Sequence, residues 1–194
     1  MDRSARIERK TRETNITVSL NLDGSGKAEI NTGIGFFDHM MTSFALHGGF
    51  DLELTVKGDL FVDGHHTVED SGIAIGMAFD EALGQRVGIS RFASAFVPMD
   101  EALSFAAIDI GGRPYFKFEA EIPVCMMGEY DSQMTVEFMR ALCFNMKSTL
   151  HIKNIYGDNA HHMTESIYKC VARALKEGVS ISGADGAPST KGVI

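Results

Sequence analysis

The 194-residue sequence lacks tryptophan, has only three cysteines and contains no long apolar segment. No hydrophobic run approaches the ~20 residues that a membrane span requires, and the charged start MDRSARIERKTRE lacks the apolar core of a secretory signal. Cys125, Cys143 and Cys170 are odd in number and form no C-x-x-C pair. This pattern excludes a disulfide scaffold and a thiolate zinc site, and we expect a reduced, cytoplasmic protein with no membrane partner.

Basic residues are also scarce, because 18 Lys and Arg stand against 26 Asp and Glu, for a net charge of −8. Affinity for a nucleic-acid duplex comes largely from cations that neutralise phosphates, and no Lys/Arg cluster stands out, so we expect no nucleic-acid partner. With 44% apolar and 23% charged residues, the chain has the composition of a folded globular protein. Its length suits one domain, or two small similar units that share a core.

The chain repeats itself about half-way along its length. The motif HHxxE occurs at 65–69 and again at 161–165, an offset of 96 residues. Each copy opens a helical pattern, and the two patterns end near Gly84 and Gly178. Each is also preceded by a short strand-like run and a Gly-Asp pair. A fixed offset of this kind indicates duplicated structural units.

Upstream of those runs, each half carries an amphipathic segment with helical spacing, at 35–46 and at 133–144. Still further upstream, alternating residues predict two hairpins around Gly-rich turns, which would pair 15–22 with 27–31 and 102–110 with 115–122. Each half therefore reads strand, strand, helix, strand, helix. We predict an α+β fold of two similar halves, with the helices packed between two small sheets.

We expect a single domain made of two repeats, about 3–90 and 91–180, followed by a tail at 181–194. The first dozen residues and the residues after Gly178 fall outside the repeated pattern. The tail is small and polar, a composition that by itself favours disorder.

The two HHxxE motifs carry the clearest chemical signal. On a helix, residues three and four apart share a face, so both histidines of each motif lie near its glutamate. The adjacent imidazoles diverge by about 100°, so one helix start can address two metal ions, or a metal and a substrate. Imidazole with carboxylate and no thiolate suits Mn, Fe, Ni or Zn better than Ca or Mg. The candidate ligands are His65, His66, Glu69, His161, His162 and Glu165.

A packing or capping role for the duplicated motif is the alternative. Four histidines and two carboxylates in equivalent places favour ligation, since histidine is not a preferred residue at helix starts. His39, in the first amphipathic segment, has Glu137 as its counterpart in the second, and both residue types can ligate a metal. His47 and His151 have no counterpart and are either supporting donors or plain surface residues.

Basic residues provide a second, weaker signal. Arg91 and Arg113 stand among apolar neighbours. Lys169 follows Glu165 by four residues and so lies on the same helix face, and Lys191 follows Ser189 in the tail. A pair of guanidinium groups with ammonium and hydroxyl donors suits a phosphate group. Taken singly, each of these residues is more simply a solvated charge.

Together, these motifs resemble one enzyme family, the imidazoleglycerol-phosphate dehydratases of histidine biosynthesis. The resemblance runs from about residue 3 to 192 and rests on an ordered series of segments. These are Arg12-Glu13-Thr14, Gly35-Phe36-Phe37-Asp38-His39-Met40, Asp63 to Asp70, Asp109 to Pro114, Leu150-His151, His161-His162-x-x-Glu165 and Pro188 to Gly192. We expect the monofunctional form of the family, which carries no additional phosphatase domain.

The resemblance implies a cofactor, an assembly and a reaction. Members of the family bind two Mn(II) ions per active site, with ligands from the HHxxE helices and from the positions of His39 and Glu137. They assemble as 24-subunit particles with active sites between subunits. They convert imidazole-glycerol 3-phosphate to imidazole-acetol phosphate and water. The residues that match the family's phosphate-binding positions are Arg91, Arg113, Lys169, Ser189 and Lys191.

The implied reaction removes water across a carbon–carbon bond beside an imidazole ring. A metal on an imidazole nitrogen helps the ring lose its proton, and the metal-bound imidazolate can expel the side-chain hydroxyl. Loss of a carbon proton then gives an enol, which tautomerises to the ketone. Glu13 matches a catalytic carboxylate near the substrate diol, with Glu69 or Glu165 possible if one is not a metal ligand. The polar tail fits a segment that orders over bound substrate and excludes water.

Two other functions are compatible with the motifs alone. One is a metal-storing or metal-sensing oligomer, and the other is a duplicated small-molecule binding module. A storage protein has no use for Arg91, Arg113 and Lys191 converging on a metal site. The basic residues therefore favour the dehydratase.

Overall fold

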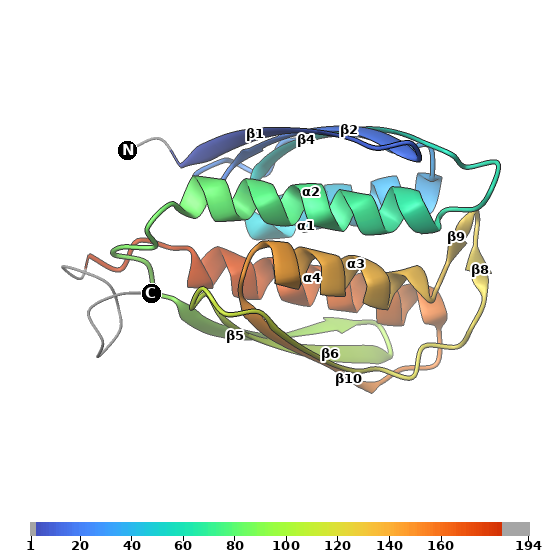
Figure 1. Ribbon diagram of the computed structural model, residues 1–194. Coiled ribbons are helices and arrows are strands. Elements are labelled where there is room, and N and C mark those ends of the chain that lie inside the picture. Colours follow the sequence, from blue (N-terminus) through green and yellow to red (C-terminus); the bar gives the residue numbers. More distant parts are fainter. Residues whose placement is uncertain (1–2, 184–194) are drawn as a thin grey trace.

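The computed structural model of the chain describes residues 3–183. Two four-stranded sheets enclose four helices in a layered arrangement (Figure 1). The first sheet has the order β1-β2-β4-β3 and contains β1 (Ser4–Lys10), β2 (Thr14–Asn21), β4 (Asp51–Gly58) and β3 (Ala28–Asn31). The second has the order β5-β6-β10-β7 and contains β5 (Phe92–Met99), β6 (Ala102–Asp109), β10 (Thr149–Tyr156) and β7 (Tyr115–Glu119). The matching strand orders confirm an α+β fold with two similar halves.

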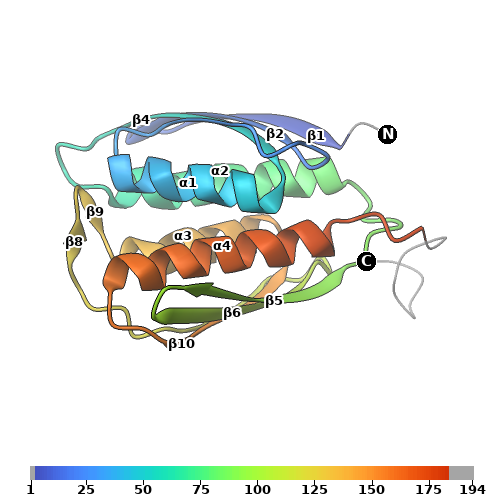
Figure 2. The same ribbon diagram turned by 180° about the vertical axis from the view of Figure 1, so that it is seen from behind.

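The four helices form the middle of the molecule. They are α1 (Gly35–Gly48), α2 (His65–Leu83), α3 (Met134–Asn145) and α4 (Ala160–Gly178). Within each half, α2 lies against β1 and β2, and α4 lies against β5 and β6. Between the halves, α2 packs on α3 and α1 packs on α4, as the two opposite views show (Figures 1 and 2). Each helix pair therefore joins the first half to the second.

Alternating burial explains why the sheets face the helices as they do. Inward-facing residues such as Ile16, Val18 and Leu54 are fully buried, whereas their neighbours along the strands are exposed or half-buried. The helices contribute large apolar side chains to the same core, including Phe44 and Leu142. Burial of this apolar area from both sheets stabilises the stack of layers.

The strand pairing differs from the predicted hairpins. The segments at 15–22 and 27–31 do not pair with each other, because β4 lies between β2 and β3 and pairs with β3 in parallel. The actual hairpin joins β1 to β2, so the first dozen residues belong to the repeat after all. The second half has the same arrangement, with β5 paired to β6 and β10 between β6 and β7. Alternation identifies strands but not their partners, which explains the error.

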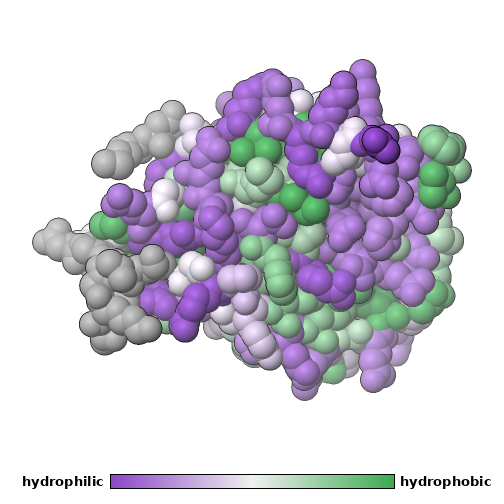
Figure 3. All heavy atoms as spheres, in the orientation of Figure 1, coloured by the Kyte–Doolittle hydropathy of each residue, from purple (hydrophilic) through white to green (hydrophobic). Residues whose placement is uncertain are grey.

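A short hairpin of β8 (Met126–Met127) and β9 (Tyr130–Asp131) stands apart from both sheets. In Figure 3 most of the visible surface is hydrophilic, with hydrophobic side chains at the end of the molecule where β8 and β9 lie. Phe61, Val124 and Met126 are among the most exposed large hydrophobic residues of the described chain. No helix within residues 3–183 is long and apolar enough to cross a membrane.

Candidate metal centres

Both histidine pairs lie in the first turn of a helix and are held there by a side-chain oxygen. The Asp63 carboxylate accepts a hydrogen bond from the backbone N–H of His65 at 2.8 Å, where α2 begins. The Asn159 side chain accepts one from the N–H of His161 at 2.9 Å, where α4 begins. Such contacts satisfy backbone donors that a helix start leaves unpaired. The orientation of each HHxxE motif is therefore set locally.

The first candidate centre, the α1–α4 cluster, consists of His39, His161 and Glu165. One carboxylate oxygen of Glu165 lies 3.1 Å from the His161 Nε2 atom and 3.6 Å from the His39 Nε2 atom. The Glu165 side chain is almost fully buried, whereas His39 is half exposed. The ring of Phe36 meets the His161 ring edge-on with centroids 4.9 Å apart, and so limits its rotation.

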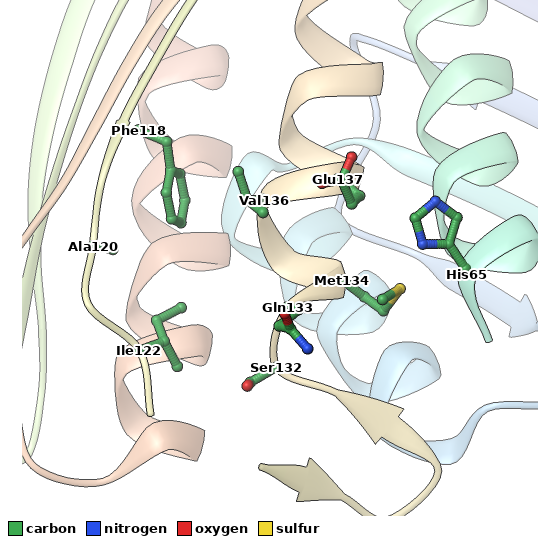
Figure 4. A pocket seen from close by; sticks show the side chains of 9 residues that line it. All are labelled: His65, Phe118, Ala120, Ile122, Ser132, Gln133, Met134, Val136 and Glu137. Carbon is green, nitrogen blue, oxygen red and sulfur yellow. The ribbon is translucent and has the colours of Figure 1, made fainter. Parts of the chain in front are cut away.

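The second candidate centre, the α2–α3 cluster, consists of His65, Glu69 and Glu137. The His65 Nε2 atom lies 3.5 Å from a Glu69 carboxylate oxygen. Figure 4 shows His65 of α2 and Glu137 of α3 on facing sides of the gap between these helices. In each cluster the ligand atoms of the three residues lie within 4.8 Å of one another.

Each cluster takes two residues from one half of the chain and one from the other. The HHxxE helix supplies a histidine and a glutamate four residues later, and the first helix of the opposite half supplies His39 or Glu137. Two ligand atoms that each lie about 2.1 Å from a metal, at right angles, are about 3 Å apart. The shortest nitrogen–oxygen distances in the two clusters, 3.1 Å and 3.5 Å, are close to this value. Imidazole nitrogens with carboxylate oxygens also match Mn(II) or Zn(II) chemistry. The donor sets therefore fit a divalent transition metal.

His66 and His162 belong to neither cluster of the described chain. Each is instead oriented by a carboxylate, with the His66 Nδ1 atom 3.1 Å from Asp59 and the His162 Nδ1 atom 2.7 Å from Glu101. Donating a hydrogen bond to the Asp59 carboxylate raises the pKa of His66, and donating one to the Glu101 carboxylate raises the pKa of His162. This arrangement leaves Nε2 of each ring as the atom available to a metal, as in carboxylate-supported ligands.

These two supporting carboxylates were not predicted from the sequence. Asp59 belongs to the Gly-Asp pair that precedes the first HHxxE motif, so a signal for it existed. Glu101 lies in the tight turn between β5 and β6, and nothing in the pattern distinguished it. Its hydrogen bonds to His162 and to the Asn159 amide lower the pKa of Glu101 to about 2. Glu101 is therefore ionised at neutral pH and acts as a permanent acceptor.

A basic residue accompanies one carboxylate of each cluster. The Lys169 Nζ atom lies 2.7 Å from the Glu165 oxygen that faces away from the imidazoles, and Arg140 forms an ion pair with Glu137. Burial by itself raises the pKa of Glu165, but Lys169 and the neighbouring histidines outweigh burial and lower it. Glu165 is therefore held as a carboxylate, the form that binds metals. Lys169 thus lies beside the α1–α4 cluster, on the face that the sequence predicts.

Glu13 lies in the turn between β1 and β2, one of its carboxylate oxygens 3.8 Å from the Nε2 atom of His66. Its backbone is held by the Thr11 hydroxyl, which accepts from the Glu13 N–H, and by the Asp59 N–H, which donates to the Glu13 carbonyl. The side chain is half exposed. An anchored backbone with a half-exposed carboxylate suits a group that approaches a bound ligand.

Arg91 and Arg113 lie at the other end of the second half. The Arg91 N–H donates to the Gly178 carbonyl at the end of α4, and Arg91 forms an ion pair with Asp109 at the end of β6. His161 is 17 residues from Gly178, so about 26 Å of helix separates them. Ser189, Lys191 and most of the expected tail lie outside the described residues. Within one chain, Arg91 therefore lies far from the His161 end of the α1–α4 cluster.

His47 and His151, which have no counterpart in the other half of the chain, have different surroundings. His47 lies in the last turn of α1, where burial and the charges of Lys169 and Arg173 lower its pKa. His151 lies on the exposed face of β10, where its ring meets that of Tyr115 with centroids 5.6 Å apart. Neither residue contributes to the two clusters.

A pocket of about 320 Å³ opens beside the α2–α3 cluster (Figure 4). His65 and Glu137 line one side of it. The remaining lining residues include an apolar wall, formed by Phe118, Ala120, Ile122 and Val136. An apolar wall facing a few polar groups is typical of a site for a small ligand.

The family model of imidazoleglycerol-phosphate dehydratase matches residues 32–175, a range that contains both clusters. The chain belongs to this family. Among curated members, the enzyme of Acetivibrio thermocellus is 50% identical over 195 residues and that of Clostridioides difficile is 54% identical over 189. The first alignment covers all of both chains, and the second covers 97% of this chain and 98% of its relative.

Solved structures of the family agree with the fold. Imidazoleglycerol-phosphate dehydratase of Staphylococcus aureus superposes with a TM-score of 0.83 at 35% identity, over 92% of this chain and 99% of the other. The enzyme of Pyrococcus furiosus, in complex with (S)-C348, gives 0.84 at 36% identity, over 97% and 100%. Family membership makes this chain a dehydratase, a carbon–oxygen lyase of histidine biosynthesis.

Proposed function

We propose that the chain converts imidazole-glycerol 3-phosphate to imidazole-acetol phosphate and water, with two Mn(II) ions per active site. The observation that supports the proposal most directly is the pair of histidine–glutamate clusters, each assembled from both halves of the chain. A divalent ion in such a site supplies Lewis acidity toward an imidazole nitrogen of the substrate. The carboxylate-supported His66 and His162 add two further imidazoles, whose Nδ1 atoms face the carboxylates Asp59 and Glu101.

The protein's own side chains supply the acid–base group, the metal ligands and the surface that holds the substrate ring. Glu13 is the acid–base group that removes or returns a proton at a side-chain carbon, because it is an exposed carboxylate on an anchored turn. Glu69 and Glu165 serve as ligands, since each faces a histidine four residues earlier. The pocket wall beside His65 offers an apolar surface that can hold an imidazole ring and exclude water.

Phosphate binding requires association of chains under this proposal. Lys169 lies at the α1–α4 cluster, but Arg91 and Arg113 lie about one helix length away. A neighbouring copy can supply the arginines, together with Ser189 and Lys191 of the tail, to a cluster that lacks them. Exposed hydrophobic residues such as Phe61 and Met126 fit a surface that associates. The 24-subunit particle with sites between subunits is the assembly we propose.

The decisive experiment is a turnover assay on the full chain. Protein stripped with a chelator receives imidazole-glycerol 3-phosphate with and without Mn(II), and the ketone product is followed. We expect product only with metal. Metal binding without turnover by any divalent ion, in folded and assembled protein, would reject the proposed reaction and favour a metal-binding protein.

A further inference from the structure

The two clusters occupy equivalent places in the repeat but differ in their donor atoms. The α1–α4 cluster has two imidazoles and one carboxylate, because α1 contributes His39. The α2–α3 cluster has one imidazole and two carboxylates, because α3 contributes Glu137. The HHxxE part is the same in both, so residues 39 and 137 alone create this difference.

The neighbouring cations widen the difference in charge. Lys169 lies against Glu165 with only 16% of its side chain exposed, so the α1–α4 cluster and its cation are formally neutral. Arg140 lies against Glu137 with 49% of its side chain exposed, and Glu69 adds a second carboxylate. The α2–α3 cluster thus keeps one negative charge, and its cation is more strongly screened by solvent.

We propose that the two clusters bind divalent metals unequally, with Glu137 and His39 as the residues that set the order and the preference. The α2–α3 cluster fills first with Mn(II) and takes the harder ions. The α1–α4 cluster binds Mn(II) more weakly and prefers nitrogen-seeking ions such as Zn(II). This inference rests on the proposed function only in that both clusters hold metals.

The accessory histidines do not remove the inequality. His66 and His162 are each supported by one carboxylate, so whichever cluster they complete receives the same kind of ligand. An extra anionic ligand a few ångströms from a divalent ion remains in one cluster and not in the other. At the effective dielectric of a protein surface, that difference is worth at least about tenfold in affinity.

The test is a titration of chelator-stripped, full-length protein with Mn(II), in which free ion is followed by electron paramagnetic resonance. The wild type should bind two equivalents in two steps separated by at least about tenfold. Glu137→His should weaken the tight step until the two steps merge. The matched variant His39→Glu should strengthen the weak step by a similar factor and leave the tight step in place.

Competition with Zn(II) gives a second measurement. Zn(II) should displace the weakly held Mn(II) equivalent first in the wild type, and His39→Glu should reduce that preference. Lys169→Met should strengthen the weak step as well, because it removes the buried cation from Glu165 without altering a ligand. This variant keeps the test valid if either ligand variant fails to assemble, which gel filtration and circular dichroism report.

Two outcomes overturn the inference while the metal sites stand: equal Mn(II) affinities in the wild type, or a Glu137→His variant in which only the weak step changes. A wild type that binds no Mn(II) overturns the inference too, but it also rejects the proposed metal dependence, which the turnover assay then tests separately.

Discussion

Glu165 illustrates how a single residue serves two neighbours at once. One oxygen faces the imidazoles of His39 and His161, while the other accepts from Lys169. The spacing of residues along α4 predicts the contacts with His161 and Lys169, because i and i+4 share a face. The contact with His39 comes from another helix and depends on how α1 packs against α4.

Glu13→Gln tests the acid–base role of the β1–β2 turn. The amide keeps the size of the side chain and one acceptor oxygen but cannot take up a proton, so turnover should fall at least about 10²-fold. Substrate binding should change little, because the turn is anchored through its backbone rather than through this side chain. Steady-state kinetics with saturating Mn(II), alongside a direct binding measurement, separates the two effects. A near-normal rate would remove Glu13 from the mechanism.

The cysteines give a prediction about pH. Burial raises the pKa of Cys143 to about 11 and that of Cys170 to about 12, whereas Cys125 is exposed. Because the thiolate is the reactive form, iodoacetamide should label Cys125 at pH 8 and spare the other two until the protein is unfolded.

Mass spectrometry of the labelled, digested protein identifies the reacted thiols, and urea-unfolded protein is the control. Native labelling of Cys143 or Cys170 at the rate of Cys125 would contradict their burial. A raised pKa stabilises the fold while the thiol stays neutral in both states. That contribution is lost as the pH rises from the ordinary value of 9.0 toward 11.

At the scale of elements, the contact between α2 and α3 depends on two glycines. A Cβ atom at Gly72 would lie 2.7 Å from the Phe138 carbonyl oxygen, and one at Gly76 would lie 2.7 Å from that of Leu142. Both distances are shorter than real Cβ contacts. The helices approach this closely because the glycines lack side chains, and Glu137 of α3 thereby reaches His65 and Glu69 of α2.

Gly76→Ala should therefore destabilise the protein, although alanine favours a helix by about 0.5–1 kcal/mol. Overpacking against backbone atoms costs about 1–3 kcal/mol, and the larger of the two effects decides the sign. Thermal unfolding should show a lower midpoint. The control is Gly35→Ala at the start of α1, where a Cβ atom meets nothing within 4 Å among the described residues. An unchanged midpoint for Gly76→Ala would mean that the helices separate freely.

At the scale of the whole molecule, the two halves exchange residues. Each cluster joins helices from both halves, so neither half holds a complete cluster by itself. The arginines expected to bind phosphate lie at the far end of α4 from His161. A site that uses both groups requires two copies of the chain.

Complementation between inactive variants tests this requirement. His161→Ala and Arg91→Ala should each be nearly inactive as single species. When they are unfolded, mixed and reassembled together, random pairing should restore activity to at most about a quarter of the sites in a symmetric oligomer. Each variant refolded alone is the control. If mixing restores no activity to well-assembled particles, both groups come from the same chain and the proposed site between subunits is wrong.

The local features of this protein follow from the sequence itself. The helix at 65–84 was predicted to within a few residues, since the apolar period and the spacing of His65 and Glu69 act over one or two turns. The sequence also indicated that His39 and Glu137 are counterparts, because duplicated segments keep equivalent residues at equivalent positions. Their roles as metal ligands stay a prediction.

Only the tertiary structure decided which segments meet. Strand alternation does not specify a partner, so β4 between β2 and β3 was missed, and so was the place of β1 in the repeat. Glu137 lies beside His65 rather than beside the histidines of its own half because α3 packs on α2. Asp59 and Glu101 lie in loops that the fold brings next to His66 and His162. These contacts arise from long-range packing of apolar faces, which short-range patterns do not encode.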